Sequence, residues 1–406
     1  MSKRAIVFYL HVHQPYRIRH YTIFDAGSRH DYFNAPGGAR ENNADILRKV
    51  AEKSYLPTNE RLLRMLSENP EFKLSLSLSG ILLEQLEKFA PDVLESFKQV
   101  VGTGRVEILA ETYHHTLAFF FSRDEFERQV TMHRKIIERI FGVTPTAFRN
   151  TELAYDNDIA YWADKAGYEA VLCEGWDGIM GWRSPNFVYK PAYTDNIKLL
   201  TKNYKLSDDI AFRFSNKSWQ EYPLTTEKFI DWTNVSWDQP LLNLFMDYET
   251  FGEHQWADTG IFDFFETFVG KWIGTGGSYQ TVTEAAKTHE PVDTISMPDT
   301  TTWADSERDL SAWLGNDMQK EIARYLYALE NDVMRSGDDE LIRDWRYLQS
   351  SDLLYYLSTK WLNDGDVHTY FSPYGSPYDA FLYYMNAIRD VRWRVMRHHN
   401  LGGLNG

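Results

Sequence analysis

The sequence predicts an α/β protein in which parallel strands alternate with helices and a helical region follows. Strand-like and helix-like segments recur at a spacing of roughly thirty residues, the length of a βαβ unit. The run AIVFYLHV at 5–12 has the continuous apolar character of a strand covered on both faces and carries His11 near its end. After Trp303 the composition changes to long helical repeats. This pattern is typical of a parallel barrel or a doubly wound sheet.

Each predicted element follows from the period of its apolar residues. At 74–79 leucines alternate with serines, which indicates a strand with one apolar face and one face of small polar side chains. The stretch 241–256, LLNLFMDYETFGEHQW, begins as a buried strand and turns acidic at Asp247, just before a glycine. The predicted strands are 5–12, 74–79, 105–110, 146–150, 170–173, 198–204, 209–214, 241–247 and 294–297. The predicted helices are 43–53, 57–67, 81–89, 91–101, 126–141, 157–166 and 262–273, with further helical repeats around 318–329, 341–348 and 381–395. No low-complexity linker occurs near residue 300, so we expect tight packing between a domain at 1–300 and one at 301–406.

Composition and charge exclude several classes of function. The net charge of −15 disfavours nucleic acid and anionic membranes as partners. The single cysteine, Cys173, excludes an intramolecular disulfide and a thiolate cluster. The apolar run near the start covers only Ala5 to Leu10 and ends in histidines, so we interpret it as a first strand and expect a cytoplasmic protein. With 13 Trp and 25 Tyr, the chain has more flat rings with polar edges than a core requires, and such rings bind sugar faces.

Four polar clusters lie at the predicted strand exits. They are His11 with His13, Glu111 with His114, Glu152, and Asp247. In a parallel barrel all such exits converge on one face, which would bring these side chains into one cleft.

Two kinds of chemistry fit these clusters. His11 and His13 resemble the metal-binding pair of metal-dependent amidohydrolases and deacetylases, although the exits of strands four to six offer Glu152 and Glu174 but no histidine. Alternatively, Glu152 and Asp247 form the carboxylate pair of a glycosidase, one ionised nucleophile and one protonated acid. Histidines and aromatic rings would then hold the sugar hydroxyls.

Several segments resemble, in order and approximate spacing, the five sequence regions of glycoside hydrolase family 57. They are HQP at His13, GRVEILAETYHH at Gly104, FRNTELAY at Phe148, MDYETFGEHQW at Met246 and TTWADSERDLSAWLGN at Thr301. The segments LQSSDLLYY at Leu348 and VHTYFSPYGSPYDAF at Val367 are similar to the C-terminal helical region of the family's short α-amylase branch. The resemblance therefore spans nearly the entire chain.

The resemblance implies both a fold and a mechanism. The fold is an incomplete seven-stranded parallel β/α barrel, TIM-like, with a C-terminal helical bundle. The barrel would be the catalytic domain at 1–300, and the helices at 301–406 would pack on it and contribute to the cleft. In the family the third-region glutamate is the nucleophile and the fourth-region aspartate the acid/base, which correspond to Glu152 and Asp247. The implied substrate is an α-glucan or maltooligosaccharide, with no metal and no cofactor.

The remaining site residues are candidates for substrate binding. They are His11, His13, Glu111, His114, Arg149, Trp176, His254 and Trp303. The NTELAY segment departs from the ECGY-like form of the family's transferases, which favours α-amylase activity. The alternatives are a 4-α-glucanotransferase or branching enzyme of the same family, a metal-dependent deacetylase or amidohydrolase, and a non-catalytic glucan-binding protein. The sequence does not indicate an oligomeric state.

Overall fold

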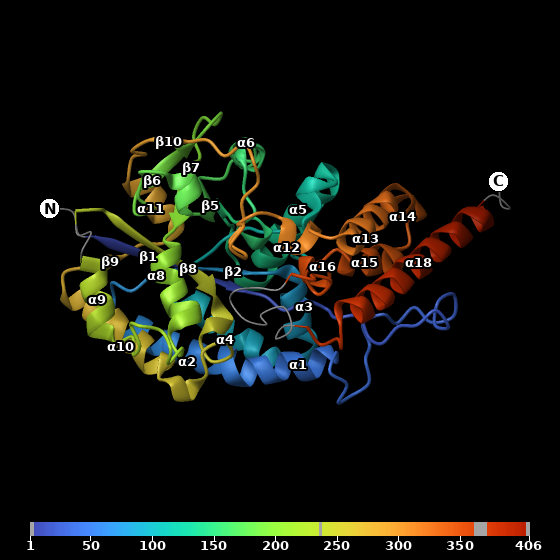
Figure 1. Cartoon of the computed structure of the whole chain (residues 1–406), viewed down its shortest axis with the longest axis horizontal. Helices are drawn as coiled ribbons and strands as arrows, with labels where there is room; N and C mark the ends of the chain where they lie inside the picture. Colours follow the sequence, from blue (N-terminus) through green and yellow to red (C-terminus); the bar gives the residue numbers. More distant parts are fainter. Residues whose placement is uncertain (1–3, 235–237, 361–371, 403–406) are drawn as a thin grey trace. The chain divides into compact units, whose positions relative to one another are not determined.

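The computed structural model describes residues 4–234, 238–360 and 372–402, which form an α/β protein with parallel sheets (Figure 1). The strands are β1 (Ala5–Val12), β2 (Leu74–Leu78), β3 (Val106–Ile108), β4 (Ala147–Phe148), β5 (Ala170–Glu174), β6 (Val188–Pro191), β7 (Lys198–Lys202), β8 (Leu241–Asp247), β9 (Ser278–Tyr279) and β10 (Thr294–Ile295). Residues 367–371 of the segment at Val367 lie outside the described residues.

Helices separate most of the strands. They are α1 (Asn43–Val50), α2 (Leu56–Glu68), α3 (Gly80–Phe89), α4 (Pro91–Gly102), α5 (Arg123–Phe141), α6 (Asn157–Lys165), α7 (Asp177–Met180), α8 (Tyr204–Asp208), α9 (Thr226–Asn234), α10 (Ile261–Gly274), α11 (Val282–Thr288), α12 (Ser311–Leu314), α13 (Asp317–Ala328), α14 (Glu330–Ser336), α15 (Asp339–Tyr347), α16 (Ser351–Tyr355) and α18 (Pro377–Gly402). Over the described part of the chain, none of them combines the length and the hydropathy that a bilayer span requires.

The described strands form two five-stranded sheets. One has the order β3-β2-β1-β8 with β9 also beside β1, and the other has the order β10-β6-β7-β5-β4. Every strand pair is parallel except β6 with β7. Backbone hydrogen bonds join the sheets at two places, from Ala110 N to Ala147 O at 2.9 Å and from Asn203 N to Asn243 O at 2.9 Å. The carboxyl ends of the parallel strands are therefore neighbours across both sheets.

Alternate side chains of the parallel strands share one apolar core. Val7 and Tyr9 of β1, Leu172 of β5 and Phe245 of β8 belong to a single buried cluster. All eight residues of β1 are buried, so both faces of this strand are covered, as its unbroken apolar run predicts. Because side chains alternate along a strand, residues with this orientation at the carboxyl ends point toward the same interior.

One predicted strand is wrong. Residues 209–214 are helical, since α8 is followed by a π-helical turn at Asp209–Arg213. The consecutive residues Ile210 and Ala211 are both buried, whereas Phe212 is 60% exposed. A strand would place Ile210 and Phe212 on the same face, so the exposure of Phe212 shows why the alternation misleads here.

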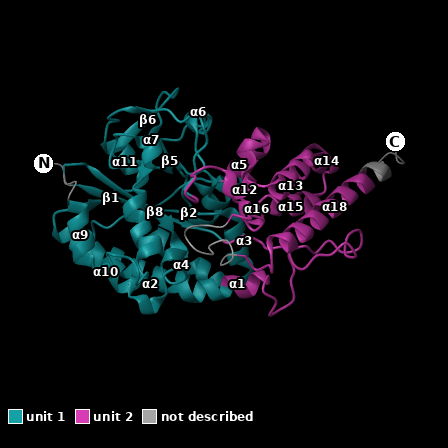
Figure 2. Cartoon of the chain, in the orientation of Figure 1, with its two compact units in different colours: residues 1–13, 48–111, 132–303 teal, residues 14–47, 112–131, 304–406 magenta. Residues whose placement is uncertain are grey.

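The chain divides into two compact units, each assembled from three separate segments (Figure 2). Unit 1 comprises residues 1–13, 48–111 and 132–303, and unit 2 comprises residues 14–47, 112–131 and 304–406. The helices after Trp303 therefore share their unit with two segments from the first third of the chain. The domain boundary near residue 300 stays a prediction, because a compact unit is not by itself an independently folding domain.

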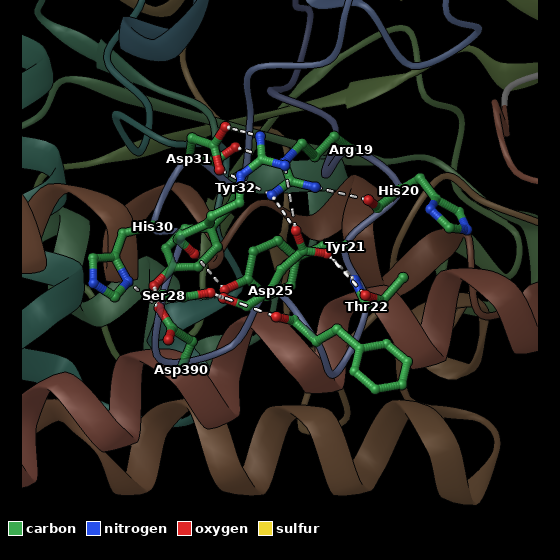
Figure 3. Close-up of polar contacts among 12 residues, drawn as sticks. Arg19, His20, Tyr21, Thr22, Asp25, Ser28, His30, Asp31, Tyr32 and Asp390 are labelled. Atoms are coloured by element: carbon green, nitrogen blue, oxygen red, sulfur yellow. Dashed lines mark hydrogen bonds and ion pairs between the residues drawn. The ribbon is translucent and has the colours of Figure 1, made fainter.

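Within unit 2, the loop that precedes α1 is bonded to α18 through a buried carboxylate, Asp390 (Figure 3). Asp390 accepts hydrogen bonds from Gly27 N at 2.5 Å, from His30 Nδ1 at 2.6 Å and from the Tyr32 hydroxyl. Its side chain is fully buried, so these donors take the place of water around the carboxylate. Arg19 stabilises the same loop from within.

Asp390→Ala is expected to lower the free energy of unfolding by about 3 kcal/mol, because it leaves three donors without their acceptor in a buried site. Arg389→Ala is the matched control, since Arg389 is the exposed neighbour on α18 and should change stability by less than about 0.5 kcal/mol. Urea unfolding measures both variants. Equal effects of the two substitutions would contradict a structural role for Asp390.

Candidate functional site

The carboxyl ends of the parallel strands of unit 1 carry ionisable side chains. β1 and β8 are adjacent, and their register places His11 opposite Asp247. β5 and β7 are adjacent as well, and Glu174 lies opposite Lys202. The shared location of these side chains follows from the direction of the strands, because a parallel sheet brings all carboxyl ends to one edge.

Two histidines at the carboxyl end of β1 lie beside serines at the carboxyl end of β2. His11 Nδ1 lies 2.9 Å from Ser77 Oγ, and His13 Nδ1 lies 2.6 Å from Ser79 Oγ. The two imidazole rings are stacked, with centroids 5.8 Å apart. The polar face predicted for the second strand therefore serves to orient both rings.

Glu111 connects this histidine pair to the next strands. Its side chain is fully buried, with Oε1 3.6 Å from His11 Nδ1 and Oε2 3.8 Å from an Arg149 nitrogen. His133 fixes the backbone of Glu111, whose N–H donates to His133 Nδ1 at 3.3 Å, while His133 Nε2 donates to Leu78 O at 2.9 Å. Burial lowers the pKa of His133, which is therefore neutral and holds one defined tautomer.

Glu152 lies in a strained turn after β4. Glu152 has φ 59° and Leu153 has φ 50°, a left-handed conformation that costs a residue with a side chain roughly 1–2 kcal/mol. Tyr155 and Thr301 hold the turn by two backbone hydrogen bonds of 2.9 Å each. Such strain persists only where the surrounding structure imposes it, and it concentrates at functional sites.

Trp303 binds Glu152 directly. Its indole Nε1–H donates to Glu152 Oε2 at 2.8 Å, and its backbone N–H donates to Glu152 O at 3.3 Å. The same indole ring lies edge-on to His11, with centroids 6.4 Å apart. The indole N–H of Trp303 therefore fixes the position of the Glu152 carboxylate, and a hydrogen bond to a carboxylate oxygen favours the charged form of such a group.

Two cations lie near the Trp303 ring. The Arg149 guanidinium is 5.1 Å and the Lys202 ammonium 5.6 Å from the ring centroid. Lys202 is bound to Asp208 at 2.9 Å and lies 3.6 Å from Glu174. Their positive charges favour the ionised form of nearby carboxylates.

Arg149 differs from Lys202 in its hydrogen bonding. It is fully buried, and its three guanidinium nitrogens have no hydrogen-bond partner among the described residues. Native proteins rarely leave buried donors in this state unless a ligand or water completes them. Arg149 is therefore suited to bind a group that enters the site.

Asp247 ends β8, and Glu249 follows it in a short helical turn. Burial, and then the charge of Asp247, raise the pKa of Glu249 to about 8. The Tyr55 hydroxyl donates to Glu249 Oε1. Glu249 therefore retains its proton near neutral pH, two residues from Asp247.

Three other predicted substrate-binding residues, His254, Trp176 and His114, differ from one another in their surroundings. His254 lies in the turn after Asp247, where burial lowers its pKa to about 4, so it is neutral. The Trp176 ring packs so closely on Gly178 that an added Cβ there would lie 2.6 Å from it. His114 belongs to unit 2, where its Nδ1 lies 2.8 Å from Gln129 Oε1. Roles in substrate binding for these three residues stay predictions.

The sequence did not single out Lys202, Tyr55 or His133. A lysine at the end of an apolar strand is the one available signal for Lys202, whereas Tyr55 and His133 lie on helical segments without any local motif.

Two side chains of unit 1, His11 and Glu111, are close enough together to serve as metal ligands. The described residues of that unit place no third ligand close to both.

Two sequence comparisons identify the family of this chain. The family model described as glycosyl hydrolase family 57 matches residues 7–298. A protein from Methanocaldococcus jannaschii named "Putative alpha-amylase" is 40% identical over 403 residues, which cover 96% of this chain and 84% of the relative.

Solved structures share the fold. A GH57 branching enzyme from Thermococcus kodakaraensis matches with a TM-score of 0.65 at 13% identity, over 88% of this chain and 86% of that chain. An α-amylase from Thermotoga maritima matches with a TM-score of 0.63 at 14% identity, over 99% of this chain and 93% of that chain. With the family model covering residues 7–298, these findings show that the chain belongs to glycosyl hydrolase family 57 and is a glycoside hydrolase.

Proposed function

We propose that the protein is a retaining α-glucan hydrolase of the α-amylase type, with Glu152 as nucleophile and Asp247 as acid/base. The observation that carries the proposal is the contrast between the two carboxylates. Glu152 accepts the indole N–H of Trp303, whereas Asp247 lies two residues from Glu249, whose raised pKa keeps a proton next to it. A glycosidase needs one ionised and one protonated carboxyl group, and we assign these states to Glu152 and Asp247 respectively.

The fold supports the same proposal. The hydrogen bonds at Ala110 and Asn203 join the two sheets at both ends, which fits an incomplete barrel of seven parallel strands formed by β1, β2, β3, β4, β5, β7 and β8. The active sites of such barrels lie at the carboxyl ends of the strands. The relatives that are named as an α-amylase and a branching enzyme act on α-glucans, which supports an α-glucan as substrate.

In the proposed mechanism, Asp247 protonates the leaving oxygen while Glu152 attacks the anomeric carbon. Arg149 and the histidines of β1 bind the sugar hydroxyls. Asp247 then deprotonates a water molecule, which releases the sugar from Glu152 with retention of configuration. This mechanism requires the two carboxyl groups to lie about 5 to 5.5 Å apart.

Product analysis on maltooligosaccharides and soluble starch, followed by NMR, tests the proposal. We expect the first-formed product to be the α-anomer. An initial β-anomer would mean inversion and would remove Glu152 from the nucleophile's role. Longer oligosaccharides formed from a short substrate would identify the protein as a 4-α-glucanotransferase or branching enzyme instead.

The same assay run after exhaustive chelation separates the glycosidase from the metal-dependent alternative. Activity is expected to survive EDTA, because the proposed steps use carboxyl groups alone. Loss with EDTA and recovery with Zn²⁺ would favour a deacetylase or amidohydrolase built on His11 and His13.

Trp303→Phe is expected to lower kcat/KM roughly 10- to 100-fold, because it removes a donor to an ionised carboxylate. The acid limb of the pH–rate profile should also move to higher pH, since Glu152 loses a group that stabilises its charged form. Trp272→Phe is the matched control: its buried indole N–H donates to Ser278 O at 2.9 Å in the same unit. An unchanged acid limb in Trp303→Phe would contradict the role of the indole.

Two substitutions beside Asp247 should move the basic limb in opposite directions. Glu249→Gln removes the like charge that helps the pair retain its proton, so the proton is lost at lower pH. Tyr55→Phe removes a donor that stabilises the ionised Glu249, so the proton is lost at higher pH. The basic limb of kcat/KM measures both shifts. Shifts of the same sign would show that Glu249 does not control this proton.

A further inference from the structure

A tyrosine outside the candidate site has a strained backbone and an exposed ring. Tyr193 lies in the turn between β6 and β7, with φ 62° and 79% of its surface exposed. Its ring has no stacking or cation contact among the described residues. An asparagine or glycine would adopt this conformation at lower cost, and no packing of the ring accounts for the tyrosine.

The turn that carries Tyr193 is fixed on α6. Asp164 accepts the backbone N–H groups of three successive turn residues, Asp195 at 3.1 Å and Asn196 and Ile197 at 2.9 Å each. The Thr194 hydroxyl donates to Pro191 O at 2.8 Å. These bonds hold the backbone beside Tyr193 in place, so the exposed ring extends from a rigid support.

A second tyrosine lies on the helix that holds this turn. Tyr161 of α6 is 48% exposed, and the Lys165 ammonium is 5.3 Å from its ring centroid. Lys165 also binds Asp195 at 2.8 Å. The ion pair therefore connects the face of α6 that carries Tyr161 to the turn that carries Tyr193.

This surface lies at the opposite edge of the sheet from the candidate site. The turn leads into the amino end of β7, where Lys198 N donates to Glu169 O just before β5. Glu174 and Lys202 end the same two strands. Four residue steps along these strands span ~13 Å, so the surface is separate from the carboxyl edge.

The chemistry of this surface fits a sugar better than a protein partner. The Lys165–Asp195 ion pair joins the two segments that carry the exposed rings, and Asn196 is also exposed. A protein interface needs a contiguous apolar centre, which the ion pair interrupts. A sugar presents flat apolar faces bordered by hydroxyls, which match rings that alternate with hydrogen-bonding groups.

We propose that Tyr161 and Tyr193 form a second α-glucan binding site, remote from the catalytic carboxylates. The proposal rests on the proposed function for the choice of ligand. The site would bind one stretch of a long α-glucan while another stretch enters the catalytic cleft.

Electrophoresis in native gels that contain glycogen tests this site without turnover. The full chain carries Glu152→Gln in every sample, so the polymer is not cleaved. Tyr193→Asn removes the ring and keeps a residue that tolerates positive φ, and Tyr161→Ala removes the second ring. We expect each substitution to raise the Kd for glycogen roughly fivefold, and Tyr193→Phe to leave it near the parent value.

Tyr378→Ala is the matched control, because Tyr378 is a 65% exposed tyrosine on α18 of unit 2. Unchanged glycogen binding in the Tyr161→Ala, Tyr193→Asn double variant would overturn the second site. A change of oligomeric state in that variant, measured by size-exclusion chromatography, would also overturn it in favour of self-association. Failure of the wild-type protein to cleave maltooligosaccharides would contradict the proposed function alone, because glycogen binding is measured independently.

Discussion

Glu152→Gln is expected to lower kcat/KM on α-glucans by at least about four orders of magnitude. The amide cannot form the ester with the anomeric carbon, and loss of a covalent nucleophile removes the whole two-step route. Glutamine has nearly the same shape and keeps an oxygen that can accept the Trp303 indole N–H. The substitution should therefore leave the strained turn intact, which a thermal melt checks.

Azide provides the positive test for Glu152. In Glu152→Ala, which removes the side chain beyond Cβ, an azide ion can occupy the space left by the carboxylate and attack an activated α-glucosyl fluoride from the nucleophile's side. The expected product is the β-glucosyl azide. Full activity of the variant, or an α-azide product, would show that another residue is the nucleophile.

Asp247→Asn is expected to lower kcat on starch by about three orders of magnitude, because general acid catalysis contributes typically 10²- to 10⁴-fold. Formation of the glycosyl-enzyme from α-glucosyl fluoride should change by less than about tenfold, since fluoride needs no strong acid to leave. Here azide should yield the α-glucosyl azide, because it attacks the covalent intermediate from the side of Asp247. Equal losses on starch and on the fluoride would contradict the acid/base role.

The strands could be predicted wherever burial on both faces leaves an unbroken apolar run. The strand at 5–12 is confirmed with the same bounds, and the strand at 241–247 is likewise confirmed. The helix at 262–273 is confirmed as α10, which extends it by one residue at each end. The stretch 209–214 fails because exposed Phe212 is apolar, so polarity no longer reports which side faces water.

The contacts that define the site could not be predicted, because their partners are distant in sequence. The hydrogen bond from Trp303 to Glu152 joins residues 151 positions apart. Nothing in the residue type of Glu152 signals a left-handed conformation, since the neighbouring chain imposes it. In the sequence Lys202 is only a polar residue near the end of a predicted strand. Its burial could not be predicted, because it depends on the ion pairs with Asp208 and Glu174.

The order of strands in the first sheet has a consequence for the nascent chain. β1 pairs along one side with β8, whose last residue is Asp247. At ribosomal rates of about 5 to 20 residues per second, β8 is complete about 10 to 50 s after β1 has been made. During that interval β1, which is apolar from Ala5 to Leu10, has an unpaired edge of the kind that templates aggregation. Until β8 has been made, β1 thus lacks the neighbour that pairs with this edge of the strand.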